Sequence, residues 1–596
     1  MRSIRVGAMT YQKDNLATEY EEVTTTADSA EIEEQEPEVE EQEPGVESQE
    51  EHARPQDTTD EVEPEGKENA PQAEKQISTL QQVGLVLEQV MLKASMGLAA
   101  LVLLYLTYHS LRYTYYFYDY EHEVLYTGAD GVLKHLLILC LPVAGILLYR
   151  FVFVGWQTGK EEAKTWILRG LLAIEVFTTF ILGVIWVKTA HIYPDGDQAF
   201  LMMAAEMFQN GDYTLLGRGG YLHYHPHQLG MVYVLEWMYR LFGNGKYYVF
   251  QYFNVLCTMV TQILGYLLVK EMTQKHGAKI AYLFLQPLFL PVFLYIGFVY
   301  GDVPSIAFTF ALLLCIMKFY ETDYIRYGLL AILMSTLALL VRKNSLIVLI
   351  AVLIVLAVKS IKDRSLRGFL IILGLVMTAS LLNPLLHRHY ERVSGQELMT
   401  GIPNSAYIAM GMMDGYPGPG WYNNFNKEVF QQADLDTEMA DEASKQVIRD
   451  RREVFRADKA YARDFYKRKF LSQWNEPTYG AFYLNSRFVP EHAETDFTYR
   501  LFYGDLHGKA VALLNELQIL VYVLSLAGAL KVVWREKRGE LSLIPIVVFG
   551  GVLFSFLWEA KSRYVLGYVA LLIPLASYAL SFAGKEQATR HTKENQ

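Results

Sequence analysis

Residues 325–358 read IRYGLLAILMSTLALLVRKNSLIVLIAVLIVLAV. Two apolar runs, 325–341 and 345–359, flank the short polar segment Arg342-Lys343-Asn344. A helix needs about 20 mostly apolar residues to cross the ~30 Å hydrocarbon core of a bilayer. The stretch therefore predicts two membrane helices that meet at a short, charged loop.

Similar runs occur on both sides of this stretch, in a chain of 596 residues that is 52 % apolar. We predict an all-α polytopic membrane protein with about 12 transmembrane helices. The predicted spans are 94–117, 133–155, 166–190, 247–269, 279–298, 303–320, 325–341, 345–359, 366–386, 510–533, 541–558 and 562–583. They form a transmembrane region at 81–386 and a C-terminal pair of helices within 509–584.

The basic loops between spans predict the orientation, because Lys and Arg concentrate on the cytoplasmic side. These loops lie at 150–164, 270–279, 326, 359–367 and 535–538. All of them face the cytoplasm if the moderately apolar stretch 226–242 is an interfacial or re-entrant helix rather than a span. We therefore expect a multi-pass protein of the cell membrane with both termini in the cytoplasm.

The N-terminal residues 1–80 have a different composition. They contain 23 Asp and Glu against 6 Lys and Arg, a net charge of −17, whereas the whole chain carries −12. The segment 31–65 has no aromatic residue and cannot bury enough apolar surface to offset the entropy of ordering. We predict a disordered acidic cytoplasmic tail, either simply solvated or docking to a basic partner, and a short cytoplasmic tail at 585–596.

Two long polar segments lie outside the cell in this topology. The first outer loop, 191–246, follows the third span, and the second segment, 387–508, is rich in Tyr, Trp, Asn and Gly. The second is long enough for a small extracytoplasmic subdomain, in which 441–469 predicts a helix. A loop of that size is typical of an enzyme with an extracellular substrate and is rarely needed by a transporter.

Two carboxylates open the first outer loop, in Tyr193-Pro-Asp-Gly-Asp-Gln198. Asp195 and Asp197 at the water–lipid boundary can act as a general base and its partner, or can hold a divalent cation. The alternative is a polar turn that ends a helix, since Pro-Asp-Gly is favourable turn chemistry. We consider both residues candidate catalytic groups.

Further along the same loop, three alternate histidines occur in His223-Tyr-His-Pro-His227. Alternation places side chains on one face only in an extended strand, so a hydrogen-bonding loop is the simpler interpretation and a metal site the alternative. At the end of the fifth span, Tyr300-Gly-Asp302 precedes a helix with Pro304 in its first turn. Asp302 can therefore cap that helix and contact substrate as well.

Cations lie at the predicted outer boundary, where the positive-inside rule disfavours them. Arg342 and Lys343 join two spans, and Glu559, Lys561, Arg563 and Tyr564 precede the last span. Cations in this position can clamp a lipid phosphate, for which the planar fork of Arg is best suited. We therefore consider Arg342, Lys343, Glu559, Arg563 and Tyr564 candidate substrate-binding residues.

Other site classes have little support in the sequence. The three cysteines lie in apolar runs, which argues against disulfides and thiolate metal sites, and no Gly-rich phosphate loop is present. We predict no nucleic-acid partner. An outward-facing transferase must work without cytoplasmic nucleotide donors, and a sugar linked to polyprenyl phosphate meets that requirement.

The first outer loop, from Asp197 through Tyr213 to Tyr221 and His225-Pro226, resembles that of GT-C glycosyltransferases. The similarity is greatest to the protein O-mannosyltransferase and lipid A aminoarabinose transferase group, including its uncharacterised bacterial members. The segments 300–302, 340–344 and 559–564 resemble that group too, so the likeness extends over roughly 165–583.

The resemblance implies inverting transfer of a sugar from a polyprenyl-phosphate carrier to an extracytoplasmic glycan, lipid or protein of the cell envelope. Asp197 matches the base of that group, with Asp195 as its neighbour and Asp302 as a second acidic residue. Arg342, Arg563 and His225 would hold the donor phosphate. Gln198 replaces the usual acidic residue after the base. This change argues against a required metal ion, and a divalent cation is kept as the alternative.

Two other functions are compatible with the sequence. A transporter or flippase of lipid-linked glycans would carry charges at mid-membrane depth and internal repeats. The sequence shows neither, and Glu88, Lys93 and Glu175 are among the few ionisable residues near or within the early spans. A non-catalytic assembly protein of the cell envelope would use the acidic tail to bind its partner. Replacing the tail should abolish function in the second case and leave sugar transfer intact in an enzyme.

Overall fold

The computed structural model describes residues 79–117, 123–137, 140, 161–486 and 492–581. Nearly all of the predicted tails at 1–80 and 585–596, and most of the predicted span 133–155, lie outside these residues.

Within the described part, eight helices are long and apolar enough to cross a membrane, or nine if one bent pair counts as a single span. The eight are α1 (Thr79–Ser110), α3 (Glu161–Ala190), α7 (Tyr248–Met272), α10 (Asp302–Thr322), α12 (Leu346–Asp363), α13 (Leu366–Ser394), α20 (His507–Arg535) and α21 (Leu543–Leu557). These helices confirm a helical multi-pass membrane protein, whereas the predicted number of 12 spans is not confirmed.

The bent pair consists of α8 (His276–Leu288) and α9 (Leu290–Leu294), which runs into the 3-10 turn η3 (Tyr295–Gly297). Pro287 and Pro291 lie on either side of the break, and the two parts meet at 45°. Proline cannot donate a backbone hydrogen bond and clashes with the preceding turn, which explains the break.

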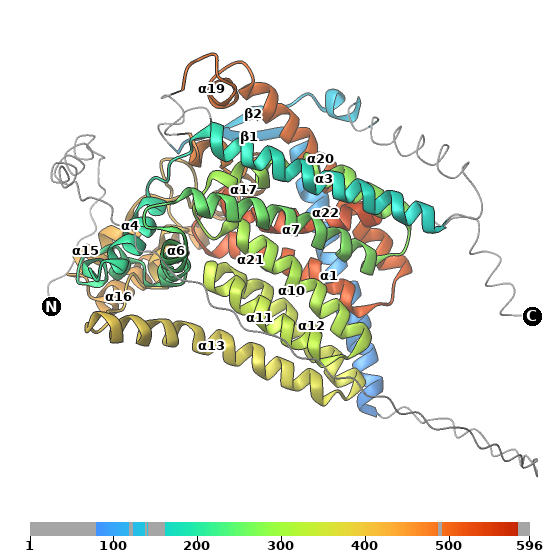
Figure 1. The fold of residues 1–596 in the computed structure, drawn as a ribbon, viewed down its shortest axis with the longest axis horizontal. Coiled ribbons are helices and arrows are strands. Elements are labelled where there is room, and N and C mark those ends of the chain that lie inside the picture. The colour runs from blue at the N-terminus through green and yellow to red at the C-terminus, as the bar shows by residue number, and fades with distance from the viewer. Residues whose placement is uncertain (1–78, 118–122, 138–139, 141–160, 487–491, 582–596) are drawn as a thin grey trace, which may run out of the picture. The chain divides into compact units, whose positions relative to one another are not determined.

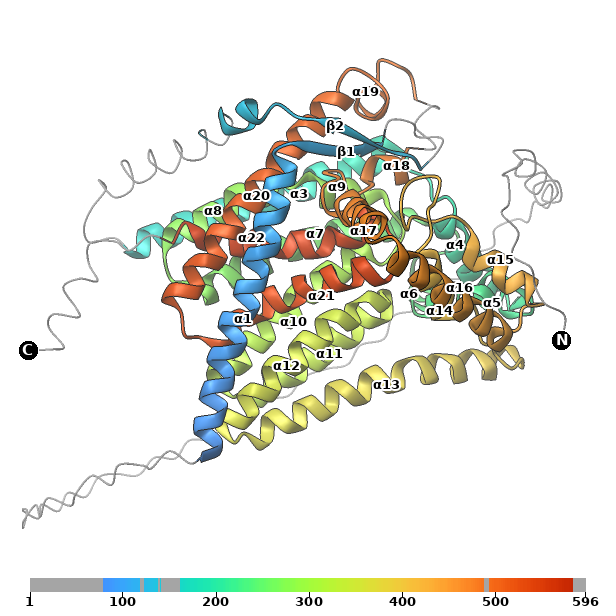
Figure 2. The same cartoon turned by 180° about the vertical axis from the view of Figure 1, so that it is seen from behind.

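Two shorter apolar helices, α11 (Ile325–Val341) and α22 (Leu566–Ala579), complete the bundle (Figure 1). The 3-10 turns η4 (Lys343–Ser345), η6 (Gly539–Ser542) and η7 (Ser562–Val565) precede α12, α21 and α22. The core of the bundle lies around α10 and α22, whose residues are mostly buried. Figure 2 shows α1 running across the back of the bundle, where it packs against α20 and α12.

The remaining elements lie at the end of the bundle where α3 runs into α4, which we call the loop end (Figure 1). From the first loop they are α4 (Asp197–Gln209), η1 (Thr214–Leu216), α5 (Tyr221–Tyr224), η2 (Pro226–Gln228) and α6 (Leu229–Phe242). From the second polar segment they are α14 (Asn404–Met410), α15 (Phe425–Gln432), α16 (Thr437–Ala457), α17 (Lys459–Trp474), α18 (Ala481–Leu484) and α19 (Phe497–Phe502).

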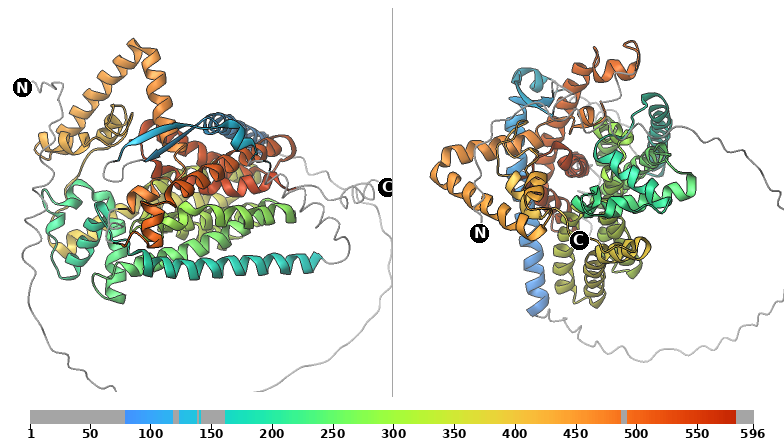
Figure 3. Two further views of the ribbon diagram at one scale, coloured as in Figure 1. Left: turned by 90° about the horizontal axis from the view of Figure 1, so that it is seen from above. Right: turned by 90° about the vertical axis from the view of Figure 1, so that its left-hand side faces the viewer.

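Two details of the second segment and the first loop refine the predictions. The predicted helix 441–469 is two helices, because Asp458 leaves the helical conformation and its carboxylate caps α17, accepting bonds from Ala460 N and Tyr461 N. Figure 3 shows these two orange helices meeting at an angle. The stretch 226–242 forms η2 and the 14-residue α6, which is only ~21 Å long and too short to span the membrane.

The prediction of a helix over 94–117 was wrong at both ends. Helix α1 begins at Thr79 and ends at Ser110, and Tyr113–Phe117 forms the strand β1, which pairs with β2 (Leu125–Ala129) in antiparallel register. Aromatic and β-branched residues favour a pleated strand where a partner strand is available. This hairpin is the one sheet in the described part of an otherwise helical fold.

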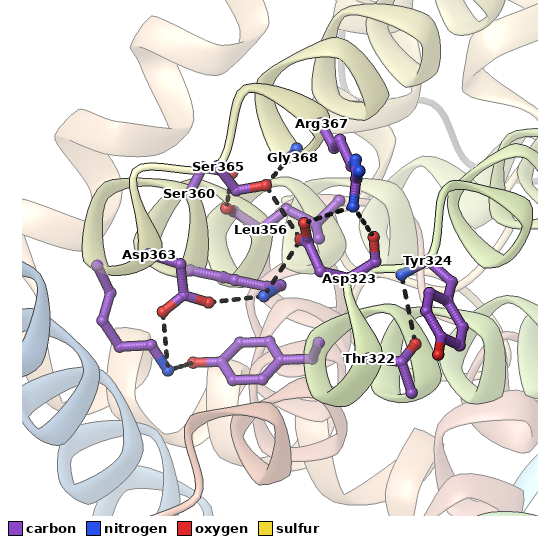
Figure 4. Close-up of polar contacts among 12 residues, drawn as sticks. Thr322, Asp323, Tyr324, Leu356, Ser360, Asp363, Ser365, Arg367 and Gly368 are labelled. Atoms are coloured by element: carbon purple, nitrogen blue, oxygen red, sulfur yellow. Dashed lines mark hydrogen bonds and ion pairs between the residues drawn. The ribbon is translucent and has the colours of Figure 1, made fainter. Parts of the chain in front are cut away.

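At the opposite end of the bundle, a polar network joins α10, α12 and α13 (Figure 4). Asp323 ends α10 in the left-handed conformation, and its carboxylate accepts a bond from Ser365 Oγ and lies 3.5 Å from Lys359 Nζ. Arg367 Nη1 lies 3.6 Å from the other oxygen of Asp323. Lys359 and Arg367, both in the basic loop predicted at 359–367, thus join that loop to the end of α10 through Asp323.

Candidate functional site

Asp197 is the first residue of α4, directly after Gly196, whose φ of 57° turns the chain out of the preceding loop. A carboxylate is favoured in the first turn of a helix, where backbone N–H groups carry partial positive charge. The Asp197 side chain keeps contact with solvent, and its Oδ1 accepts a hydrogen bond of 3.2 Å from Tyr221 Oη. It is therefore open to an incoming molecule on one side and held on the other.

Opposing influences set the pKa of Asp197. Desolvation by the surrounding protein raises the pKa, but the charges of His225 in its protonated form and of Arg563, Lys561 and Lys427 lower it, and the result lies below the usual value for Asp. Asp197 is thus ionised at neutral pH, which is the state required of a proton acceptor.

His225 is the histidine that faces Asp197. Its ring packs on Tyr221 with 5.0 Å between centroids, and its Nδ1 lies 3.2 Å from Tyr407 Oη. Burial lowers the pKa of His225 to about 4, although the Asp197 carboxylate opposes this shift. The imidazole is therefore neutral at pH 7 and acts through hydrogen bonding rather than charge.

The three alternate histidines do not share one face, because α5 and η2 are helical rather than extended. His223 turns away from His225, packs against Phe430, and accepts a hydrogen bond from Gly219 N at its Nδ1. Among the described residues, no group of three or more His, Cys, Asp or Glu side chains is arranged to hold a metal ion.

Arg563, in η7, lies in an aromatic enclosure. Its guanidinium carbon is 4.8 Å from the centre of the Tyr300 ring, 5.4 Å from Phe298 and 5.6 Å from Tyr564. Tyr300 is also fixed by Gln228, whose amide donates a hydrogen bond to Tyr300 Oη. Burial and then the Asp197 charge raise the pKa of Tyr300 to about 12, so its hydroxyl keeps its proton.

Asp302 and Arg342 form an ion pair at the loop end of α10 and α11. They line a cavity of about 50 Å³ together with Asn344, Ser345 and Tyr564, among others. Burial, followed by the positive charge of Arg563, lowers the pKa of Arg342 to about 10. The charge of Arg563 thus acts on Arg342, whose guanidinium is paired with Asp302.

The last predicted segment joins this cavity to the second polar segment. Glu559 accepts a hydrogen bond from Tyr564 Oη, and burial raises the pKa of Glu559. Lys561 Nζ lies 3.5 Å from Glu123 and 5.7 Å from the centre of the Tyr422 ring. These side chains form the wall beside Arg563.

One ion pair, one hydrogen bond and electrostatic interactions link most of the predicted residues: Asp197, His225, Asp302, Arg342, Glu559, Arg563 and Tyr564. Lys343 is exposed and does not line the Arg342 cavity. Asp195 is half-buried two residues before α4, and its carbonyl accepts a bond from Gln198 N. Roles for Lys343 and Asp195 stay predictions.

Gln198, which the resemblance singled out as a departure, is buried and turned into the protein. Its Oε1 accepts a 2.7 Å hydrogen bond from Val299 N. The bond ties the start of α4 to the segment that carries Tyr300 and Asp302. Gln198 therefore aligns two parts of the site rather than lining it.

Several supporting residues were not predicted from the sequence. Lys469 in α17 is fully buried and donates to Gly411 O at 2.6 Å and to Phe556 O at 3.0 Å. Burial lowers the pKa of Lys469 to about 7. Glu476 accepts backbone bonds from Thr478 N and Gly480 N. The sequence gives no signal for Lys469, since its partners are distant in the chain.

The second polar segment holds the Glu559–Tyr564 segment in place. Ala560 N donates a 2.7 Å bond to Gly420 O, and Tyr407 stacks on Trp558 with 5.0 Å between ring centroids. Gly411 lies so close to Trp558 that an added Cβ would be 2.6 Å from the Trp558 carbonyl oxygen. The segment 401–480 is thus a structural part of the site.

Part of the chain is similar to a known protein family. Residues 225–387 match the family model described as dolichyl-phosphate-mannose-protein mannosyltransferase. The match includes His225, Asp302 and Arg342 and ends at residue 387, where the second polar segment begins. No curated protein matches the chain. The family match confirms the predicted resemblance and supports a membrane glycosyltransferase of the GT-C superfamily.

Proposed function

We propose that this GT-C-type membrane glycosyltransferase transfers a sugar from a polyprenyl-phosphate carrier to a hydroxyl-bearing acceptor of the cell envelope, with inversion at the sugar carbon. The observation that carries this proposal is the position of an ionised, solvent-accessible Asp197 within the electrostatic field of the buried Arg563. A base and a phosphate-binding cation are the two groups that such a transfer needs.

The reaction is a single displacement. The Asp197 carboxylate accepts the proton of the acceptor hydroxyl as the acceptor oxygen attacks the sugar C1 from the face opposite the phosphate. The bond between C1 and the phosphate oxygen breaks, and its electron pair leaves with the polyprenyl phosphate. Attack from the opposite face inverts the configuration at C1.

Arg563 and Arg342 stabilise the charge that develops on the departing phosphate. The guanidinium of Arg563 is oriented by the rings of Phe298, Tyr300 and Tyr564, and that of Arg342 by Asp302. Donors fixed before the reaction lower the barrier without further reorganisation. His225 and Tyr407 provide neutral hydrogen-bonding groups beside them.

Aromatic side chains near Asp197 are suited to contact with sugar faces. Phe200 and Tyr221 stack at 4.8 Å with an angle of 8° between the rings, and Phe200 is exposed. Such a platform offers flat apolar surface to the faces of a sugar ring or of an acceptor. The donor sugar and the acceptor are left to the experiment to identify.

The test is transfer of labelled sugar by the purified protein from a panel of polyprenyl-phosphate sugars. Asp197→Asn removes the base and leaves the shape of the side chain, and we expect a loss of about 10²- to 10⁴-fold in kcat. Asp212→Asn is the matched control, an exposed aspartate of the same loop whose carboxylate accepts a bond from Thr214 N.

Release of free polyprenyl phosphate by the wild type and the Asp212→Asn variant, but not by Asp197→Asn, would support both the reaction and the base. Full activity of a correctly folded Asp197→Asn variant would exclude Asp197 as the base. Absence of transfer from every donor, with binding of the donors demonstrated, would instead favour a flippase or an assembly role.

A further inference from the structure

A second cavity lies far from Asp197, among the membrane helices α3, α7, α8 and α9. It has a volume of about 480 Å³, within the range of about 300–1,000 Å³ typical of small-molecule sites. Most of its lining is apolar, and the polar side chains in it are Glu175, Thr178, Thr179, Thr258, Gln262 and Gln286. None of these residues belongs to the site described above.

The cavity opens to the outer surface of the helix bundle, between α3 and α8. Its rim includes Leu171, Ile174, Leu182 and Phe284, whose exposed fractions are 46 %, 64 %, 50 % and 58 %. Leu171, Ile174 and Leu182 belong to the candidate span α3, and Phe284 belongs to α8 of the bent apolar pair. We infer that their exposed apolar faces meet lipid rather than water. A molecule can therefore enter from the bilayer, and only a lipid-soluble molecule can do so.

Glu175 is the unusual residue of this cavity. It lies near the middle of the 30-residue α3, and neither carboxylate oxygen has a hydrogen-bond partner among the described residues. Ionisable residues at mid-membrane depth are rare and are most often functional. A polar group with no water and no protein partner is costly, so the carboxyl group is suited to a partner supplied by a ligand.

Gln262 provides a second acceptor. Its Nε2 donates a 2.7 Å bond to Thr179 Oγ1, which leaves Gln262 Oε1 without a partner among the described residues. The break between α8 and α9 lies at the same cavity, with Pro287 and Leu290 in its lining. Discontinuous helices recur at ligand sites near the bilayer midplane.

We propose that this cavity binds a neutral lipid that carries a hydroxyl group, with the hydroxyl donating to Glu175 and the apolar body lying along α3, α7 and α8. Gln262 Oε1 can only accept a hydrogen bond, and a carboxyl group accepts through its carbonyl oxygen whether or not it is ionised, so the ligand must bring a donor. A phosphate would be buried in a mostly apolar cavity with no cation among its described lining residues. The cavity is therefore distinct in its chemistry from the Arg342 and Arg563 site, which suits an anion.

The test uses the purified full-length protein in nanodiscs of phosphatidylcholine and a long-chain primary alcohol with a diazirine in its chain. Illumination should label peptides of α3, α7 or α8, and excess unlabelled alcohol should compete. In Glu175→Leu and in Gln262→Leu we expect labelling at subsaturating probe to fall about tenfold, the loss expected when a hydrogen bond to a polar or charged partner is removed.

Three controls separate this site from general contact with lipid. Glu175→Gln keeps an acceptor of the same shape and should label within about threefold of the wild type. Thr378→Leu alters a threonine of the membrane helix α13 and should label as the wild type does. A matched alkane diazirine without the hydroxyl should not distinguish Glu175→Leu from the wild type.

Equal labelling by the alcohol probe in the wild type and in folded Glu175→Leu would overturn the proposal. Absence of label from α3, α7 and α8 would overturn it too, and would show that another part of the protein covers the cavity. Should Glu175→Leu fail to fold, Gln262→Leu and the competition experiment decide alone. The readout is binding, so it is independent of sugar transfer.

Discussion

At the scale of single residues, the chemistry of the site depends on how charge is distributed around Asp197. Burial alone would make Asp197 a weaker acid, and the surrounding cations reverse that effect. A base with a low pKa is a weak proton acceptor, but it is ionised at every physiological pH. Asp197 is therefore a weak base that is in its reactive, ionised form at physiological pH. A weak base is sufficient for a reaction in which the leaving phosphate is already stabilised.

The first prediction concerns the acid limb of the pH–rate profile. Asp197 is active when ionised, so the rate falls as the pH drops through its pKa. Lys561 lowers that pKa, and Lys561→Met should therefore raise the pKa of Asp197 and move the acid limb to higher pH. The measurement is kcat/KM for transfer across the acidic range. Lys467→Met, at an exposed lysine of α17, is the control and should leave the limb in place.

The second prediction concerns the shape of Arg563. Arg563→Lys keeps the charge but loses the planar fork that packs against Tyr300 and Phe298. We expect kcat/KM to fall about 10- to 100-fold, the value of one or two charge-assisted hydrogen bonds. Arg218→Lys, at an exposed arginine paired with Asp434, should have no such effect. Unchanged kinetics in Arg563→Lys would show that only its charge is used.

At the scale of elements, the site depends on bonds between helix ends. Gln198 provides one such connection, since its hydrogen bond joins the first turn of α4 to the segment before α10. The bond is buried, so its loss leaves the Val299 amide without a partner. Gln198 thereby fixes the position of Asp197 relative to Tyr300.

The third prediction follows from that bond. Gln198→Leu should destabilise the protein by about 1–3 kcal/mol and lower its apparent melting temperature. It should also lower kcat more than it weakens donor binding, because Asp197 loses its alignment with the phosphate site. Gln274→Leu removes an exposed side chain-to-backbone bond and is the control. A variant that melts and turns over like the wild type would contradict the alignment role.

The helices were largely predictable because apolar runs and polar breaks are local signals. The strand at Tyr113–Phe117 was missed because a run of aromatic residues fits a helix or a strand until its partner at 125–129 is known. The end of α16 at Asp458 was missed because a capping aspartate inside a charged segment looks like any other surface acid.

The site was predictable to the extent that it uses charges at the ends of apolar runs. Asp197, Asp302, Arg342 and Arg563 all have this property, and it marks them in the sequence. Tyr407 and Lys469 could not be found in this way, because their contacts with His225 and Phe556 join segments far apart in the chain. Only the folded structure brings those segments together.

At the scale of the whole molecule, the chain divides into two units at Glu74, and all contacts that build the site lie within Lys75–Gln596. The acidic charge of the protein is concentrated in the first unit, because residues 1–74 contain 23 Asp and Glu against 5 Lys and Arg, a net charge of −18. Catalysis as proposed uses groups of the second unit alone. Removing the first unit should therefore leave an enzyme active and inactivate an assembly protein that binds its partner through the tail.

The last prediction tests that distinction. Deleting residues 2–74 should leave kcat/KM for sugar transfer within about twofold of the full-length value, because no proposed catalytic or phosphate-binding group is removed. A replacement of the same length by a neutral Gly/Ser sequence controls for effects on membrane insertion. In cells, an enzyme without its tail should still restore envelope glycosylation to a strain that lacks the protein.

If the deleted and the neutral-tail proteins insert normally and fail in both assays, the acidic tail is essential and the protein acts through a partner. If they fail only in cells, the tail serves recruitment while the transfer chemistry lies in the membrane unit.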